Sequence, residues 1–109
     1  MNWIALTEEG QLETIKEESK LQPVVIFKHS TRCATSLLAK NRLEREQSPA
    51  DVKFYFLDLI KHRNISTRIA DDFGVYHESP QVLLIKNAEC TYDESHTGIS
   101  MHDICEQLN

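Results

Sequence analysis

The sequence has no long apolar stretch and no excess of basic residues, and each absence excludes a class of protein. Hydrophobic residues make up 40% of the 109, but they occur in runs too short to span a bilayer. The first residues lack the basic start and long apolar segment of a signal peptide. The formal net charge is -5, whereas general nucleic-acid binding needs a basic surface. We therefore expect a cytoplasmic protein that binds neither a membrane nor nucleic acid.

Cysteine is also scarce, with three residues in all: Cys33, Cys90 and Cys105. An odd, small number does not suit a secreted scaffold held by disulfides. In a reducing cytoplasm, disulfides tend to be transient and chemical. Zinc-ligand spacing is absent as well, so we expect no metal site. The residues that could still meet around one point are His29, Cys33, His77 and His96.

The chain length suits one domain over residues 1–109, and its periodicity predicts alternating helices and strands. The predicted elements are a helix over Glu8–Ser19, a strand over Val24–Lys28, a helix over Ser36–Glu46 buried through Leu37, Leu38 and Ala39, a strand over Val52–Leu59, a helix capped by Asn64 or Ser66 and ended by Gly74, strands over Gln81–Lys86 and Cys90–Asp93, and a last helix capped by Ser100. This order, α-β-α-β-α-β-β-α, implies parallel crossovers and a final antiparallel hairpin. We expect an α/β fold with a four-stranded mixed sheet flanked by helices.

The segment from Phe27 to Ser36 carries Cys33 from the tip of a buried strand to the first turn of a helix. Helix starts have free N–H groups and a partial positive charge, which favour an anion. A thiol there ionises more readily, and the thiolate is the nucleophile. Arg32 adds positive potential. Ser36 stands where a dithiol oxidoreductase has its second cysteine, so the segment indicates a one-cysteine redox site.

With Cys33 after the first predicted strand and Pro80 before the third, the chain resembles the thioredoxin fold, in which a cis-proline faces the reactive cysteine. Within that superfamily it resembles the bacilliredoxin-like monothiol family of the bacillithiol system. The matching segments are Val25–Cys33, Ser36, His77–Gln81 and Ser95–His96. Ala34 departs from the pattern, because many members have proline there.

The resemblance implies a monothiol thiol–disulfide oxidoreductase that removes bacillithiol, or a similar low-molecular-weight thiol, from S-thiolated client proteins. Cys33 would be the catalytic residue. No bound cofactor would be needed, because free bacillithiol serves as cosubstrate. Glutathione fits less well, since only Gly98 stands where glutaredoxins have their Gly-Gly signature.

The resemblance also assigns supporting roles around the cysteine. A cis Ser79–Pro80 bond would present the Ser79 backbone to a substrate disulfide, in a pairing like strand addition. His29 and His77 would stabilise the thiolate or shuttle its proton, although structural hydrogen bonding explains both equally well. His96, which also matches the family, is better explained as structural.

Ser36 would be a weak hydrogen-bond donor to the thiolate, or simply a small residue of the first helical turn. On the sequence alone, Lys28 and Arg32 are interpreted as solvated surface charges. Bacillithiol carries a malate group, so cations near the site would suit its carboxylates, and Thr31 with Arg32 is the preferred contact.

Two other functions remain open from the residues alone. The chain could be a non-enzymatic binding or redox-sensing module, because a fold does not guarantee chemistry. It could also be a dithiol reductase that uses Cys90 as an unconventional partner. Cys105 is interpreted as a small apolar residue on the inward face of the last helix. The aromatic residues expected to serve packing are Trp3, Tyr55, Tyr76 and Tyr92.

Overall fold

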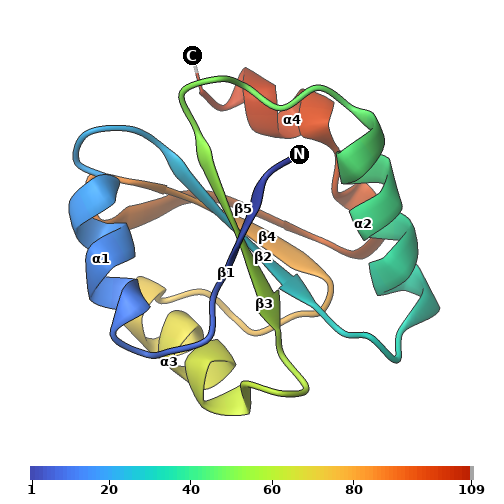
Figure 1. The fold of residues 1–109 in the computed structure, drawn as a ribbon, viewed down its shortest axis with the longest axis horizontal. Coiled ribbons are helices and arrows are strands. Elements are labelled where there is room, and N and C mark those ends of the chain that lie inside the picture. The colour runs from blue at the N-terminus through green and yellow to red at the C-terminus, as the bar shows by residue number, and fades with distance from the viewer. Residues whose placement is uncertain (109) are drawn as a thin grey trace.

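The computed structural model describes residues 1–108 and shows one mixed sheet between two pairs of helices (Figure 1). In chain order the elements are β1 (Trp3–Ala5), α1 (Gln11–Glu18), β2 (Val24–His29), α2 (Ala34–Arg45), β3 (Lys53–Asp58), α3 (Arg63–Phe73), β4 (Gln81–Lys86), β5 (Glu89–Ser95), the short 3-10 helix η1 (His96–Gly98) and α4 (Met101–Glu106). Over these residues, no helix has the length and apolar character that crossing a membrane requires.

The sheet has five strands, in the order β1-β3-β2-β4-β5, where the sequence predicted four. β2 runs parallel to β3, and β4 runs antiparallel to both β2 and β5. The additional strand is β1, which pairs in parallel with β3 at the edge. Its three residues are too few to show strand periodicity. Trp3 fixes it by stacking on Phe27, with ring centroids 5.6 Å apart.

Successive residues of β2 face opposite sides of the sheet, and both sides are buried. Ile26 belongs to the apolar cluster under α1 and α3. Phe27 belongs to the cluster under α2 and α4. Figure 1 shows these two helix pairs on opposite sides of the sheet. The alternation therefore puts Lys28 on the α1/α3 side and His29 on the α2/α4 side.

The buried face of α2 differs from the predicted one. Leu37 and Leu38 are 54% and 52% exposed, and the buried residues are Ser36, Ala39 and Leu43. Residues three or four apart share a helix face, so the face that contains Ser36 excludes both leucines. Two large apolar side chains are thus left on the surface within the first helical turns.

The predicted helix ends at Gly74 and Ser100 are confirmed. Gly74 has a left-handed backbone, with φ 63, directly after α3, and the Ser100 hydroxyl accepts the amide of the third residue of α4 at 3.1 Å. The prediction that Asn64 or Ser66 caps α3 is wrong. The helix begins directly after His62, and the Ser66 amide already donates to the His62 carbonyl within the first turn.

Candidate active site

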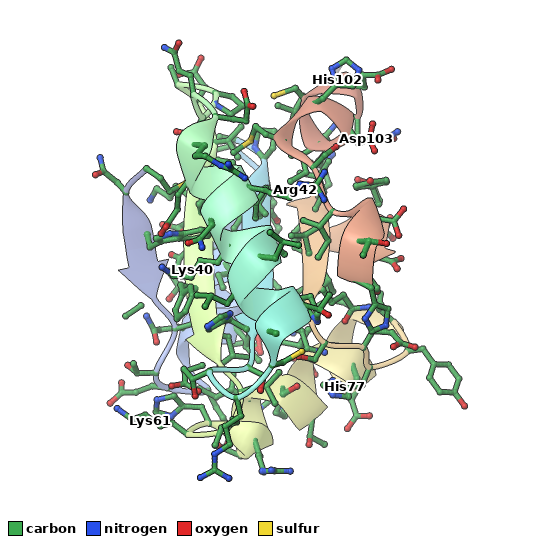
Figure 2. All side chains as sticks on the ribbon, turned by 90° about the vertical axis from the view of Figure 1, so that its right-hand side faces the viewer. Lys40, Arg42, Lys61, His77, His102 and Asp103 are labelled. Carbon is green, nitrogen blue, oxygen red and sulfur yellow. The ribbon has the colours of Figure 1, made fainter. Side chains whose placement is uncertain are left out.

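Several predicted site residues lie at the end of the sheet where β2 finishes and β4 begins, here called the β2–β4 edge. Lys28 is paired with Gln81 across the two strands. Cys33 follows Lys28 by five residues and Pro80 directly precedes Gln81, so both belong to this edge. Figure 2 shows α2 starting at the end of the molecule that carries His77, with α4 extending to the other end.

Cys33 lies directly before α2, in an extended conformation with φ -113 and ψ 120. Its amide donates to the Ser30 carbonyl at 3.2 Å, and its carbonyl accepts the Leu37 amide at 3.1 Å. The residue is partly exposed and its thiol is free. The first amides of a helix lack intrahelical acceptors and, with the helix dipole, favour negative charge. The sulfur is therefore accessible at a position suited to an anionic nucleophile.

Ser36 and His29 form a buried pair beneath this helix start. The Ser36 Oγ lies 2.7 Å from the His29 Nδ1 and accepts the Ser30 amide at 3.0 Å. Burial lowers the pKa of His29, and Lys40 lowers it further, so the ring is neutral at neutral pH. A hydroxyl has one hydrogen to donate. Through its contacts with His29 and Ser30, Ser36 ties the start of α2 to the end of β2.

Lys28 is fully buried, so the expectation of a solvated charge is wrong. The sheet alternation turns its side chain inward, on the same face as Ile26. Its Nζ lies 2.6 Å from the His77 Nδ1 and 3.0 Å from the Gln81 Oε1. Burial lowers the pKa of Lys28 to about 8, and Glu78 partly opposes this. Burial and the nearby Lys28 also lower the pKa of His77.

The segment over residues 76–80 leads into β4 and contains the cis peptide bond between Ser79 and Pro80. The Gln81 side chain holds this segment from the β4 side. Its Nε2 donates to the Tyr76 carbonyl at 3.0 Å, and its Oε1 accepts the Glu78 amide at 3.4 Å. One amide side chain thus fixes both ends of the turn before the proline.

His96 holds the same segment from the β5 side. Its amide donates to the Pro80 carbonyl at 3.0 Å, and its Nε2 lies 2.9 Å from a carboxylate oxygen of Glu78. These contacts are typical of a structural residue. The Ser79 Oγ is buried and has no hydrogen-bond partner among residues 1–108.

The surface around the β2–β4 edge carries both a cation and exposed apolar groups. Thr31 and Arg32 are exposed in the loop before α2. Tyr76 is 92% exposed, so the expectation that it packs inside is wrong. It lies between α3 and β4, in a segment where His77 and Glu78 are exposed as well. Leu37 and Leu38 of α2 are also exposed.

A cavity of about 320 Å³ opens beside His77, between α3 and the segment over residues 76–80. Its lining residues are Leu59, Arg63, Ser66, Thr67, Ala70, Asp71 and His77. A larger cavity of about 530 Å³ lies between the end of α2 and α4. That second cavity is at the far end of α2, and no residue of the β2–β4 edge lines it.

Cys90 lies far along the sheet from this edge. It is paired with Ile85, four residues along β4 from Gln81, which corresponds to roughly 13 Å of strand. A disulfide requires Cα atoms within about 7 Å, so Cys90 cannot pair with Cys33 in this fold. Burial raises the pKa of Cys90 to about 11, which further disfavours its thiolate. Cys105 lies on α4, away from the edge.

The four residues considered for a metal do not form one cluster. His29 contacts Ser36 on the α2 side of the sheet, whereas His77 contacts Lys28 on the α1/α3 side. Within residues 1–108, the group of side chains close enough to share an ion is His102, Asp103 and Glu106, on the short helix α4. Figure 2 shows His102 and Asp103 at the opposite end of the molecule from His77.

Sequence reasoning missed Gln81 as a site residue and misjudged Lys28. A signal for Lys28 was present, because strand alternation places it on the same face as Val24 and Ile26. A lysine on a buried strand face needs partners. For Gln81 the signal was a lone polar residue at the head of an apolar strand.

The strand order, the cysteine before α2 and the cis-proline segment define a thioredoxin-fold protein with a thiol oxidoreductase-type site. Solved structures share this fold. A protein described as a candidate oxidoreductase with a thioredoxin fold is 30% identical, with TM-score 0.82 over 97% of this chain and 93% of its own. Thioredoxins of Malassezia sympodialis and Fasciola hepatica are 15% and 16% identical, with TM-scores of 0.75 and 0.74, over 98% and 95% of this chain and 88% and 94% of theirs. Residues 4–104 match the family described as monothiol bacilliredoxin BrxC, and the chain belongs to that family.

Proposed function

We propose that this protein removes bacillithiol, or a similar low-molecular-weight thiol, from mixed disulfides of client proteins through Cys33. The observation that carries the proposal is one accessible thiol at the start of α2, with Ser36 three residues on. Ser36 is buried against His29 and has no sulfur. Because Cys90 lies too far away, the site has no resolving thiol of its own.

The chemistry follows from a single thiol. The Cys33 thiolate attacks the bacillithiol sulfur of the mixed disulfide, that S–S bond breaks, and the client leaves as a thiolate that takes up a proton. Cys33 then carries bacillithiol in a new disulfide. A second bacillithiol thiolate from solution attacks that adduct, which releases oxidised bacillithiol and restores the Cys33 thiolate. Each client thus consumes one free bacillithiol, which supplies the electron pair for the reduction and leaves joined to the bacillithiol that the client carried.

The surroundings of Cys33 support a small thiol and a protein as the two substrates. Exposed Arg32 and Thr31 suit the carboxylates of a malate group, and the cavity beside His77 is large enough for a small molecule. Exposed Tyr76 and the two leucines of α2 offer apolar area to a client. The backbone before Pro80 can pair with an extended client segment, as an added strand does.

A binding or redox-sensing module is the second candidate. The exposed Leu37, Leu38 and Tyr76 favour it, because an apolar surface can bind a partner without any chemistry at Cys33. The two candidates differ in turnover. An enzyme releases the client thiol and regenerates Cys33, whereas a sensor keeps its adduct.

The test uses a peptide joined to bacillithiol by a disulfide, with free bacillithiol as reductant and intact-protein mass spectrometry as readout. The wild type should form one adduct on Cys33 and release free peptide repeatedly. Cys33→Ser should do neither, and Cys90→Ser, the matched control, should behave as the wild type. The same peptide joined to glutathione should react more slowly.

Three outcomes would contradict the proposal. Equal cleavage by Cys33→Ser would remove Cys33 from the mechanism. A bacillithiol adduct that persists after one equivalent of peptide is released, with no further turnover, would support the sensor. A two-proton mass loss without an adduct would indicate an internal disulfide and therefore a dithiol mechanism.

A further inference from the structure

The proposed chemistry at Cys33 makes no use of the buried charge of Lys28. Lys28 is fully enclosed on the α1/α3 side of the sheet, where its Nζ contacts the His77 Nδ1 and the Gln81 Oε1. Ser66 of α3 also approaches the His77 Nδ1, at 3.3 Å. Burying a lysine is costly unless its ammonium group is hydrogen-bonded, so the arrangement calls for an explanation.

While Lys28 is charged, only one position of the proton on the neutral His77 ring is consistent with this contact. An ammonium group only donates hydrogen bonds, so the His77 Nδ1 must be the acceptor and its proton must lie on Nε2. At 2.6 Å the contact is shorter than an ordinary N–H···N hydrogen bond, in the direction expected when the donor is charged. A second positive charge on the ring is disfavoured, because burial and Lys28 lower the pKa of His77.

Lys28 also restrains the backbone before the cis-proline. The Gln81 Oε1 that accepts from Lys28 also accepts the Glu78 amide, and the Nε2 of the same side chain donates to the Tyr76 carbonyl. The strand that leads to Cys33 is therefore connected to the segment over residues 76–80 at two points. The first is the direct contact between Lys28 and His77. The second runs from Lys28 through the Gln81 side chain to the backbone of Tyr76 and Glu78.

We propose that Lys28 is a positioning residue: its ammonium group fixes His77 as the Nε2–H tautomer and holds the segment over residues 76–80 at the β2–β4 edge, to which Cys33 also belongs. The tautomer and the restraint are properties of the folded chain. The consequence for thiol–disulfide exchange rests on the proposed function. Moving a substrate-positioning segment by about 1 Å can slow a reaction by about two orders of magnitude.

The groups that face Lys28 set its response to pH. Glu78 is the carboxylate whose charge opposes the effect of burial, and His77 is the other titratable partner. Gln81 from β4 is neutral, as is Ser66 from α3. Farther out, α3 contributes Arg63 and Asp71 to the cavity beside His77. Since the pKa of Lys28 is about 8, raising the pH through that value yields a neutral amine, which can accept as well as donate. The Nε2–H tautomer is then no longer enforced.

Nitrogen NMR of the His77 ring tests the tautomer directly in the full-length wild-type protein. At neutral pH the Nε2 should carry the proton, and the ring signals should shift as Lys28 titrates near pH 8. A ring protonated on Nδ1 at neutral pH would overturn the proposal, and so would ring signals that stay unchanged when Lys28 itself loses its proton. This titration requires no variant and no bacillithiol, so it stands even if the proposed substrate is wrong.

The Lys28→Met variant tests the restraint, since methionine has a similar length and no donor. Its matched control is Lys86→Met, because Lys86 lies at the other end of β4 and donates to the Gln107 carbonyl at 2.8 Å. With a chromogenic aryl disulfide as probe, Lys28→Met should slow the reaction of Cys33 by on the order of tenfold and abolish the transition near pH 8. Lys86→Met should match the wild type.

Folding of each variant is checked by circular dichroism before its rate is compared. An unchanged rate and pH profile in folded Lys28→Met would overturn the positioning role. If that variant does not fold, the His77 titration of the wild type decides. A missing bacillithiol adduct with normal aryl-disulfide kinetics would contradict the proposed substrate and leave the role of Lys28 standing.

Discussion

Lys28 and His29 are consecutive residues at the end of β2, and their buried polar side chains have different kinds of hydrogen-bond partner. Both are nearly inaccessible to solvent. Lys28 faces the α1/α3 side, where its cation contacts an imidazole and an amide oxygen. His29 faces the α2/α4 side, where burial lowers its pKa and its neutral ring contacts a serine hydroxyl. One face of the strand thus buries a charge and the other a neutral hydrogen-bonded pair.

The two faces also restrain different parts of the site. His29, through Ser36, fixes the start of the helix that follows Cys33. Lys28, through His77 and Gln81, fixes the segment that contains the cis-proline. The end of β2 is therefore the junction from which both sides of the β2–β4 edge are held. Changing one face at a time should separate the two restraints.

The largest expected effect comes from removing the charge with Lys28→Met. The pKa of Lys28 is lowered from 10.5 to about 8 in the folded state. The unfolded state therefore binds more protons between these values, and the free energy of unfolding rises with pH across that window. The shift corresponds to roughly 3 kcal/mol. Lys28→Met should lack this rise and be more stable than the wild type at neutral pH, by up to that amount less the lost hydrogen bonds.

Urea unfolding at several pH values between neutral and about 10.5 measures this difference. Burial raises the pKa of Cys90, so this thiol lowers the free energy of unfolding as the pH rises, opposite to Lys28. The effect of Lys28 is therefore the difference between the curves of the variant and the wild type, which share Cys90. Lys86→Met should follow the pH dependence of the wild type. Parallel curves for Lys28→Met and the wild type would mean that the buried charge is not costly, and the contrast between the two faces would disappear.

A smaller effect is expected from the two serines that contact the histidines. Ser36→Ala removes the partner of the His29 Nδ1 and of one backbone amide, both in a buried site. Leaving such groups unsatisfied should cost about 2 kcal/mol. Ser66→Ala removes only a 3.3 Å contact to His77, whose ring keeps its lysine partner. It should cost less than about 1 kcal/mol.

Urea unfolding of both variants at neutral pH compares the two sides directly. Equal losses of stability would show that His29 depends on its serine no more than His77 does. A larger loss of stability for Ser66→Ala than for Ser36→Ala would contradict this prediction. It would mean that His77 depends more on Ser66 than on its contact with Lys28.

The sequence predicted the general fold because strands and helices leave local periodic signals. The strand that begins at Val24, the hairpin after Gln81 and the glycine that ends α3 are examples, and all three are present. It did not predict the partners of Lys28, because His77 and Gln81 lie 49 and 53 residues away along the chain. Contacts of that kind depend on strand register and on loop path, which no local pattern encodes.

The α2 helix shows the same limit at shorter range. Its amino acids predicted a helix correctly, but not which side would be buried. Leu37 and Leu38 are the more apolar residues, yet Ser36, which directly precedes them, is buried instead. Burial there follows the hydrogen bond to His29 and not side-chain hydrophobicity. The exposed leucines are a departure from local rules of the kind expected where a surface has a function.

The smallest expected effect concerns the outer support of the segment over residues 76–80. Glu78 and His96 form a hydrogen-bonded pair in which the two side chains are 48% and 53% exposed, and such exposed pairs contribute less than about 1 kcal/mol. Glu78→Gln keeps the shape and a hydrogen-bonding group, so urea unfolding should detect a change of only a few tenths of a kcal/mol, smaller still at high salt. Cys33 should react with the aryl disulfide as in the wild type. If Glu78→Gln instead slowed that reaction more than Lys28→Met, the segment would be held from the β5 side, and the buried junction at the end of β2 would not be its main restraint.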